Sequence, residues 1–307
     1  MIMIIKIGTR GSKLALAQSS WVKQKIEARH TGIKVELVKI KTRGDKILDS
    51  PLSEIGGKGL FVKEIEDALL SKRVDLAVHS MKDVPAELPD GLEISVFPER
   101  EDPHDAFVSI KYKHFEELPL KSSIGTSSLR RSTQLLHLRP DLKVVPLRGN
   151  VDTRIGKLEV GDLQAIILAA AGLKRLGLSH KISHVLPPDL VLPAVGQGAL
   201  GIELRIDSNI RKLLSFLNHR PTELILKAER AFLKKLGGGC QVPIAAYGRL
   251  NEGTLILEGM VAELYGKKVI KDKVEGYKES PGDIGIALAD KLFSMGAGRI
   301  LEQFYQK

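Results

Sequence analysis

The sequence predicts an α/β protein with two α/β domains and a smaller α+β domain at its C-terminal end. Short runs rich in β-branched residues alternate with longer stretches of helical periodicity, which is typical of mostly parallel sheets. A chain of 307 residues is also longer than one hydrophobic core usually serves. Two proline-containing segments without periodicity interrupt the alternation, as domain crossings do.

The alternation gives the expected elements in chain order. Helices are expected over 14–28 and 58–70, and in the second of these Phe61, Ile65 and Leu69 recur on one face. Three glycines at 237–239 end a later helix. Strands are expected over 2–7, 35–40, 74–78, 92–97, 143–147, 164–168, 242–250 and 254–264, and a last helix over 284–304.

The two crossing segments set the expected domain boundaries. Residues 97–103 are charged and proline-flanked, and residues 186–198 contain three prolines and two glycines. Residues 201–205 have the pattern of a strand, which we expect to return the chain to the first domain. The expected domains are 1–99 with 200–218, then 100–199, then 219–307.

The charge of the chain indicates an anionic partner. Lys and Arg number 47 against 37 Asp and Glu, for a net charge of +10, which is compatible with nucleic acid, a membrane surface or a small polyanion. Aromatic residues are only 5% and no nucleic-acid-binding motif is present, which argues against nucleic acid. No apolar run is long enough to predict a membrane span. A single cysteine fits a reducing, cytoplasmic setting.

The first candidate site follows the strand expected at 74–78. There the chain enters a polar cluster containing Lys82 and Asp83, which is stopped before Pro85. Ligands of open α/β sheets bind at the carboxyl ends of strands, so Asp83 is placed to stabilise a developing cation or to move a proton. The alternative is that Asp83 caps a turn and Lys82 is solvated.

A second candidate site is a Gly-Thr-Ser-Ser segment at 125–128 that opens a helix. Its free N–H groups and the hydroxyls of Thr126, Ser127 and Ser128 favour an anion. Arg130 and Arg131 in the first helical turn oppose the helix dipole, which indicates a bound anion close by. An ordinary helix cap with solvated arginines is the alternative.

Three further arginines are expected near strand ends, at Arg10, Arg148 and Arg154. Arginine recognises carboxylates and phosphates through two parallel hydrogen bonds, which favours a carboxylate-rich or phosphate-rich ligand. The lone Cys240 lies in a Gly-Gly-Gly-Cys segment without an adjacent histidine that could activate it, and a buried inert thiol is the alternative there. The eight histidines lack metal-ligand spacing, so no metal site is expected.

Together these segments closely resemble the porphobilinogen deaminase (hydroxymethylbilane synthase) family. The resemblance runs almost end to end and includes segments at 8–18, 42–45, 56–64, 77–85, 125–131, 147–150, 192–198 and 237–243. It implies an enzyme that condenses four porphobilinogen molecules head to tail, with loss of ammonia, into hydroxymethylbilane. Each step passes through a cationic azafulvene, and the product enters tetrapyrrole and haem biosynthesis.

The resemblance also implies roles for individual residues. A dipyrromethane cofactor is joined by a thioether to Cys240, and Asp83 is the catalytic carboxylate. Residues that match the family's cofactor-binding and substrate-binding positions are Arg10, Ser12, Lys82, Thr126, Ser127, Ser128, Arg130, Arg131, Arg148, Arg154 and Arg175. Gly57, Lys58 and Phe61 match a lid loop. The implied protein is a cytoplasmic monomer that binds porphobilinogen and the growing polypyrrole, but neither nucleic acid nor a membrane.

The implied fold has two domains like those of periplasmic binding proteins, joined by a hinge, and a third domain that carries the cysteine. A non-catalytic receptor for a carboxylate ligand is the first rival to the enzyme. Such a receptor would have an export signal, which is not recognisable here, and would leave the glycine-rich Cys240 segment unexplained. The second rival, a nucleic-acid binder, is supported by the charge alone.

Overall fold

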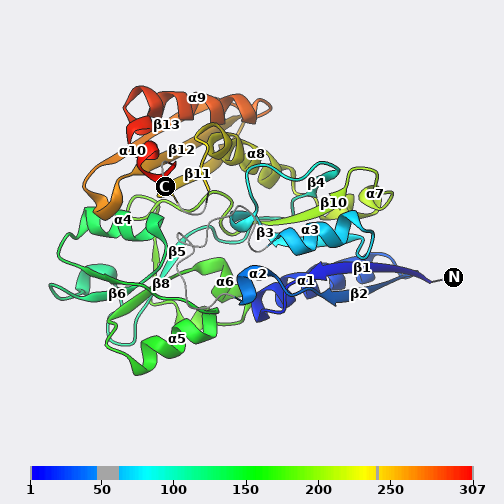
Figure 1. The fold of residues 1–307 in the computed structure, drawn as a ribbon, viewed down its shortest axis with the longest axis horizontal. Coiled ribbons are helices and arrows are strands. Elements are labelled where there is room, and N and C mark those ends of the chain that lie inside the picture. Colours follow the sequence, from blue (N-terminus) through cyan, green and yellow to red (C-terminus); the bar gives the residue numbers. More distant parts are fainter. Residues whose placement is uncertain (1, 47–61, 240–241, 306–307) are drawn as a thin grey trace. The chain divides into compact units, whose positions relative to one another are not determined.

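The computed structural model describes residues 2–46, 62–239 and 242–305. The chain forms two compact units, of which unit 1 comprises Met1–Glu101 with Ala199–Glu223 and unit 2 comprises Asp102–Gly198 with Leu224–Lys307. Each unit contains one five-stranded sheet with helices, and unit 2 also contains a three-stranded sheet (Figure 1). The predicted α/β class is confirmed. The unit boundaries at 101/102 and 198/199 fall at the expected crossings, and a third lies at 223/224. The division into three domains stays a prediction.

Unit 1 is built on a sheet with the strand order β2-β1-β3-β10-β4. Strand β10 pairs antiparallel with β3 and β4, so four of the five strands run in one direction. The predicted return of the chain to this sheet is therefore confirmed. The elements are β1 (Met3–Thr9), α1 (Lys13–Arg29), β2 (Ile33–Lys39), α2 (Arg43–Lys46), α3 (Lys63–Leu70), β3 (Leu76–Ser80), η1 (Met81–Asp83), β4 (Leu92–Val96), β10 (Leu200–Arg205), α7 (Arg211–Leu214) and η4 (Ser215–Leu217).

Apolar side chains on both faces of this sheet explain why helices cover it. On one face Ile5 and Ile7 of β1 pack with Val22 and Ile26 of α1 in a fully buried cluster. On the other face Ile65 and Leu69 belong to the apolar stripe of α3 and pack in a second cluster. Fully burying each such side chain contributes about 1.5–3 kcal/mol.

The five-stranded sheet of unit 2 has the order β7-β6-β8-β5-β9. Strands β7, β6 and β8 are parallel, and β5 pairs antiparallel with β8 and β9. In both sheets, therefore, a parallel trio has its first strand in the middle and an antiparallel strand follows the third. The elements are β5 (Asp105–Val108), η2 (Phe115–Glu117), β6 (Ser123–Gly125), α4 (Leu129–Leu138), β7 (Lys143–Val145), α5 (Val151–Val160), β8 (Ala165–Ala169), α6 (Ala170–Arg175), η3 (Ser179–Lys181) and β9 (His184–Leu186).

The C-terminal part of unit 2 is an antiparallel three-stranded sheet covered by helices. It contains α8 (Arg220–Lys235), β11 (Ile244–Asn251), β12 (Thr254–Ala262), η5 (Leu264–Gly266), β13 (Val269–Tyr277), α9 (Pro281–Ser294) and α10 (Ala297–Tyr305). Phe232 of α8, Leu257 of β12 and Leu288 of α9 share its core. The single helix predicted over 284–304 is wrong, because Gly296 adopts a φ of 97° and divides it into α9 and α10.

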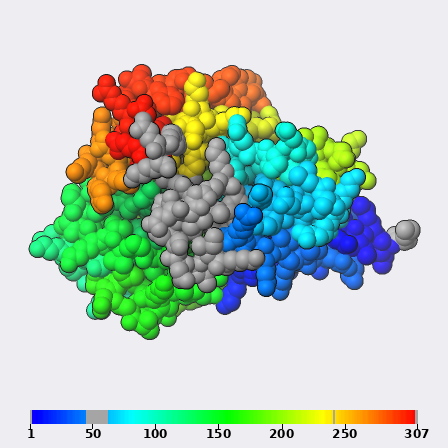
Figure 2. Space-filling model, in the orientation of Figure 1, coloured from blue at the N-terminus to red at the C-terminus, as the bar shows by residue number. Residues whose placement is uncertain are grey.

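The C-terminal part packs on α4 through η5. His137 Nδ1 lies 2.9 Å from the carbonyl oxygen of Gly266, and a side chain at Gly266 would collide with the backbone of α4. In Figure 2 the orange surface near residue 265 adjoins the green surface of α4. Among the residues that the structure describes, no helix is both long and apolar enough to cross a membrane.

Candidate functional site

The carboxyl edge of the unit 1 sheet holds the first predicted group. Strand β1 lies between β2 and β3, and the crevice outside such a change of strand order is where α/β sheets bind ligands. Arg10 follows β1, and β3 runs directly into the short helix η1, which contains Lys82 and Asp83. All three side chains are partly exposed. The structure therefore puts a carboxylate and two cationic side chains at one edge of the sheet.

Backbone contacts fix the turn that presents Asp83. The N–H of Met81 donates to the carbonyl of Ala199 at 3.0 Å, which joins the turn to the start of the returning strand β10. Met81 is only 2% exposed, and a Cβ at Gly201 would collide with its sulfur. Gln18 of α1 donates to Ser80 Oγ at 2.9 Å. Because these contacts come from β10 and α1, the turn is held independently of the Asp83 side chain.

Ser12 serves as the N-cap of α1. Its Oγ accepts a hydrogen bond from the N–H of Ala15 at 3.3 Å and so satisfies one of the donors left open at the start of a helix. The cap places Ser12 two residues after Arg10 at the same edge of the sheet.

At the carboxyl edge of the unit 2 sheet, the predicted hydroxyl residues hydrogen-bond within the chain. Thr126 Oγ1 accepts from the N–H of Ser128 at 3.2 Å, and Ser128 caps α4 by accepting from the N–H of Arg131 at 3.4 Å. Ser127 Oγ donates to the carbonyl of Leu147 at 3.1 Å. This bond ties the end of β6 to the residue that precedes Arg148.

The structure gives Arg130 and Arg131 a partner anion within the same chain. Both are only 5% exposed, and the anion that balances them is Asp105 of the same chain. Asp105 Oδ2 lies 2.7 Å from Arg130 Nη1, and Asp105 Oδ1 lies 2.6 Å from Arg131 Nη2. Arg130 also donates to the carbonyl of Leu192, and Arg131 to that of Ile167. These buried arginines therefore join α4 to β5, β8 and the second crossing, and their binding of a ligand carboxylate stays a prediction.

Asp105 is ionised in this buried network. Burial alone would raise the pKa of its carboxyl group, but the charges and hydrogen bonds of Arg130 and Arg131 outweigh burial and hold that pKa well below its ordinary value. Gln197 Nε2 also donates to Asp105 Oδ1 at 3.0 Å. The network was missed from the sequence because the only local signal was one acidic residue at the start of an apolar run, about 25 positions before the arginines.

Arg148, Arg154 and Arg175 are partly exposed, unlike Arg130 and Arg131. Arg154 Nε donates to the carbonyl of Gly149 at 2.8 Å, which folds this side chain back on the turn that follows Arg148. Arg175, at the end of α6, donates to the carbonyl of Gly198 at 2.7 Å. These backbone hydrogen bonds orient Arg154 and Arg175, which follow β7 and β8 in the chain.

Several predicted site residues lie outside the described residues. They are Gly57, Lys58, Phe61 and Cys240. The flanks of the cysteine are described. Gly237 has a φ of 68° and ends α8, and the N–H of Val242 donates to the carbonyl of Gly239 at 3.2 Å. A side chain at Gly238 would collide with Ile244, so glycine is required there for the chain to approach β11.

A buried cluster of ionisable groups beneath η1 was not predicted either. His79 of β3 and Glu203 of β10 lie on the same face of the sheet, with Nε2 of the imidazole 2.8 Å from Oε2 of the carboxylate. Burial, reinforced by Glu203 and opposed by His79, raises the pKa of the nearby Glu66 to about 7. The three residues come from three separate elements, α3, β3 and β10, so no local sequence motif predicts that they form a cluster.

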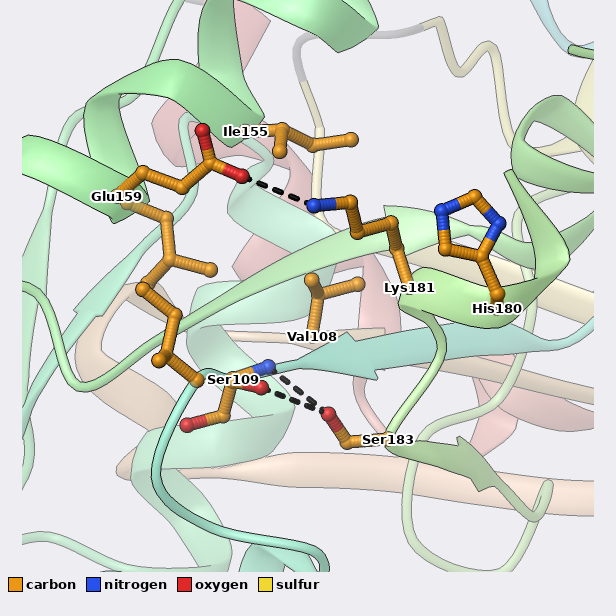
Figure 3. A pocket seen from close by; sticks show the side chains of 9 residues that line it. Val108, Ser109, Ile155, Glu159, His180, Lys181 and Ser183 are labelled. Carbon is orange, nitrogen blue, oxygen red and sulfur yellow. Dashed lines mark hydrogen bonds and ion pairs between the residues drawn. The ribbon is translucent and has the colours of Figure 1, made fainter.

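A separate pocket of about 230 Å³ lies in unit 2 between β5, α5 and η3. Figure 3 shows Lys181 directed at the carboxylate of Glu159, 3.0 Å away, and Ser109 hydrogen-bonded to Ser183. Its lining residues include none of the predicted site residues, and opposite charges already neutralise its rim. The pocket is therefore separate from the residues predicted to form the functional site.

The fold defines a class of protein, an α/β protein with two five-stranded sheets and with charged side chains at the carboxyl edge of each. Comparison with known proteins gives the family. Residues 5–212 match the family model of the porphobilinogen deaminase dipyrromethane cofactor-binding domain, and residues 224–294 match that of the porphobilinogen deaminase C-terminal domain. The chain belongs to the porphobilinogen deaminase family.

Curated relatives are similar in sequence to nearly the whole chain. The porphobilinogen deaminase of Trichlorobacter lovleyi is 54% identical over 304 residues, which are 99% of this chain and 97% of that protein. That of Nitratidesulfovibrio vulgaris is 56% identical over 305 residues, which cover 97% and 96% of the two chains. The activity is that of a hydroxymethylbilane synthase, a transferase of tetrapyrrole biosynthesis with a dipyrromethane cofactor.

Solved structures of binding proteins are similar at a lower level. The methionine-binding protein MetQ has a TM-score of 0.46 at 16% identity, with 70% of this chain and 89% of that chain covered. A periplasmic substrate-binding protein from Coxiella burnetii has a TM-score of 0.45 at 15% identity, with 72% and 94% covered. These weak similarities carry no information on what this chain binds.

The donor chemistry of the site fits a dipyrromethane. The acetate and propionate groups of such a cofactor require cationic donors, and guanidinium groups bind carboxylates bidentately. Arg148, Arg154 and Arg175 retain partial exposure. The exposed faces of these three side chains are compatible with carboxylate groups, whereas the buried Arg130 and Arg131 already hold Asp105.

Proposed function

We propose that the chain joins four porphobilinogen molecules head to tail, releases one ammonia at each addition, and yields the linear tetrapyrrole hydroxymethylbilane. The observation that carries the assignment of roles is the placement of one carboxylate after β3 and of partly exposed arginines beyond β7 and β8. Both groups stand at carboxyl ends of parallel strands, which is where α/β sheets carry out their chemistry.

Asp83 is the catalytic carboxylate in this proposal. When the bond between the aminomethyl carbon and nitrogen breaks, the electron pair leaves with ammonia and positive charge remains on the pyrrole and its methylene carbon. A carboxylate beside the pyrrole N–H stabilises that charge, and it does so best when the turn that carries it needs no rearrangement. The fixed backbone of η1 meets this requirement. The new carbon–carbon bond then forms with loss of a proton from the attacking pyrrole.

Arg148, Arg154 and Arg175, with Arg10 and Lys82, hold the acetate and propionate groups of the pyrroles. Each charge-assisted hydrogen bond of this kind contributes about 1.5–3 kcal/mol where water is excluded. Thr126, Ser127 and Ser128 support the arginines, since Ser127 fixes the backbone just before Arg148. Arg130 and Arg131 contribute by fixing α4 through Asp105.

The dipyrromethane is attached through a thioether to Cys240 and supplies the pyrrole carbon to which the first substrate unit is joined. Two features support this residue. Cys240 is the only thiol in the chain, and the glycines before it let a bulky group approach the backbone. A permanent attachment also needs no activating base next to the sulfur.

An intact-mass measurement tests this function. Protein made in a host that supplies porphobilinogen should exceed its sequence mass by two linked pyrrole units, and Cys240→Ser should lack the excess. Cys240→Ser removes the thiol with little change in volume, so its fold is expected to be retained and can be checked by circular dichroism. An unmodified wild-type mass without porphobilinogen consumption would contradict the proposal.

Asp83→Asn separates catalysis from cofactor attachment. This variant should carry the same added mass as the wild type but lose nearly all turnover, because the amide cannot stabilise the developing cation. Asp75→Asn, on the loop before β3, is the matched control, since its carboxylate accepts a hydrogen bond from the N–H of Lys6 and is not among the predicted site residues. Turnover near the wild-type value in Asp83→Asn would remove Asp83 from its role.

We also propose that the protein is a cytoplasmic monomer that binds neither nucleic acid nor membranes. The single cysteine supports a reducing compartment, and the low aromatic content argues against base stacking. Light scattering of the purified protein and fractionation of cells test these points. A stable dimer, or recovery with the membrane fraction, would contradict them.

A further inference from the structure

Three possible metal ligands meet in unit 2, away from the predicted site. His114 and Glu116 lie at η2 and His184 begins β9. One ligand atom from each of these residues can be chosen so that all three lie within 4.8 Å of one another. The two imidazole rings approach edge to face, with their centroids 4.8 Å apart. Among the described residues, this is the one such group of histidine and carboxylate side chains.

A rigid core holds this group in place. His184 stands opposite Phe107 in the pairing of β9 with β5. Phe107 is fully buried and packs edge to face against Phe115, with centroids 6.3 Å apart. Phe115 lies between His114 and Glu116 in the chain, so the same aromatic contact sets the position of all three possible ligands. Backbone hydrogen bonds from Glu117 to His114 and from Leu118 to Phe115 close the turn.

His184 has a second property that points to a ligand. Its Nδ1 is buried and has no hydrogen-bond partner among the described residues. Leaving a buried polar atom unpaired costs about 1–3 kcal/mol, so few such atoms persist without a reason. A metal ion bound to this nitrogen would remove that cost.

The set of donors selects the kind of ion. Two imidazole nitrogens with one carboxylate oxygen suit zinc and similar transition metals, whereas calcium and magnesium prefer oxygen ligands alone. Donor atoms around tetrahedral zinc lie about 3.3–3.6 Å apart, from bond lengths of roughly 2.0–2.2 Å. The donor atoms, which lie within 4.8 Å of one another, must therefore move closer together on binding, and the exposed side chains of His114 and Glu116 can rotate to do so.

Nearby charge also favours a cation. Glu117 follows Glu116 and accepts a hydrogen bond from the N–H of Lys113 at 2.8 Å. A second carboxylate therefore lies on the same turn.

We propose that His114, Glu116 and His184 form a three-ligand site for a zinc-type divalent ion, with the fourth position open to water. The ion would tie η2 to β9 and so join two parts of unit 2 that are about 70 residues apart in the sequence. The site is distinct from the catalytic one. His184 begins β9, whereas Thr126 and Arg148 follow the carboxyl ends of β6 and β7, strands parallel to β9.

Calorimetric titration of the metal-free holoenzyme with Zn²⁺ tests the proposal. The wild type should bind one equivalent, and His114→Ala and Glu116→Gln should each lose that binding. Both positions are exposed, so both variants are expected to fold. His180→Ala, which removes an exposed histidine of η3 outside the group, is the matched control and should keep the equivalent. Cys240→Ser should also keep it, which excludes binding by the thiol.

Thermal unfolding gives an independent measurement. Zn²⁺ should raise the Tm of the wild type and of His180→Ala, but not that of His114→Ala, because an ion that binds only the folded state stabilises it. Synthase turnover should be the same in the wild type and in His114→Ala. The proposal fails if the wild type shows no saturable binding, or if His114→Ala and Glu116→Gln bind as the wild type does.

Discussion

Asp105 is the residue on which the arrangement of the unit 2 site depends most. Its carboxylate is fully buried and contacts two guanidinium groups and one amide. Removing one partner of a buried ion pair is costly, because the remaining charge has lost its solvation and its counter-charge together. Here two cations share one anion, so the effect of removing the anion is large.

Asp105→Asn should therefore destabilise the protein by about 3–5 kcal/mol in chemical denaturation. Asp141→Asn is the matched control. It breaks another arginine–aspartate pair, with Arg139 Nε 2.7 Å from Asp141 Oδ1, but that pair lies at the surface, so its loss should change the Tm little. Equal losses in the two variants would show that burial of the Asp105 network does not matter for stability.

Glu66 makes stability depend on pH. Its pKa is about 7 in the folded state against an ordinary 4.5, so the folded state binds more protons than the unfolded state between these values. The contribution of Glu66 to stability therefore falls as the pH rises through this range, and the full penalty is present above pH 7.

Glu66→Gln removes the charge and should raise stability at pH 8 by about 1–3 kcal/mol relative to the wild type. The difference should shrink toward zero as the pH falls below 4.5, where the wild-type carboxyl group becomes protonated in both states. Asp67→Asn, an exposed carboxylate on the same helix, is the control and should change the pH profile much less. A pH-independent difference for Glu66→Gln would contradict the raised pKa.

At the scale of elements, the turn between β7 and α5 orients two of the proposed binding arginines. Gly149 has a φ of 113°, and a Cβ there would lie 2.8 Å from the side chain of Thr153. Its carbonyl accepts the hydrogen bond that folds Arg154 back on the turn. The geometry of Arg148 and Arg154 therefore depends on a glycine at this position.

Gly149→Ala should destabilise the protein by about 1–3 kcal/mol and raise the KM for porphobilinogen, because backbone strain displaces both arginines. For Gly156→Ala, in the middle of α5, we expect the opposite change in stability. Its Cβ meets open space, so alanine should stabilise the helix by about 0.5–1 kcal/mol and leave the KM unchanged. Denaturation curves and steady-state kinetics of both variants test these predictions of stability and KM. A Gly149→Ala enzyme with wild-type stability and KM would contradict the role of the turn.

Comparison of the predicted and observed strands shows which of them the sequence pattern encodes. Strands such as β1, β3 and β10 were predicted because apolar runs with a clear beginning and end encode them. Strand β13 was missed because most of its residues are only partly buried, and it reads locally as a charged surface segment. Strands β5 and β9 are short and lie next to the crossings, where prolines dominate the pattern. The sequence predicted the strands that Arg148 and Asp83 follow. It did not predict Asp105 as the partner of Arg130 and Arg131, because that contact depends on tertiary packing.

At the scale of the whole molecule, the net charge of +10 has a limited meaning for function. Part of the positive charge forms ion pairs within the chain, as in the pairs of Arg130 and Arg131 with Asp105. The charge that the proposed function uses is the small set of partly exposed arginines at the sheet edges. Sequence composition could indicate an anionic ligand, but only the placement of side chains separates binding arginines from structural ones.

The path of the chain predicts how each unit responds to a destabilising substitution in its core. Unit 1 is completed by β10, which arrives about 100 residues after β4 and lies between β3 and β4. Ile202 of β10 and Ile166 of β8 are both fully buried, one in each sheet. Truncating either to alanine should cost about 2–5 kcal/mol through lost burial and a residual cavity.

Hydrogen exchange followed by mass spectrometry should separate the two variants, because each unit has its own core and opens as a cooperative part. Ile202→Ala should speed exchange in β1, β3 and β4, which are distant in sequence, and leave β6 and β8 protected. Ile166→Ala should do the reverse. Matched increases in both sheets in each variant would instead mean that the units unfold as one, and the division at residues 101/102 and 198/199 would then have no thermodynamic counterpart.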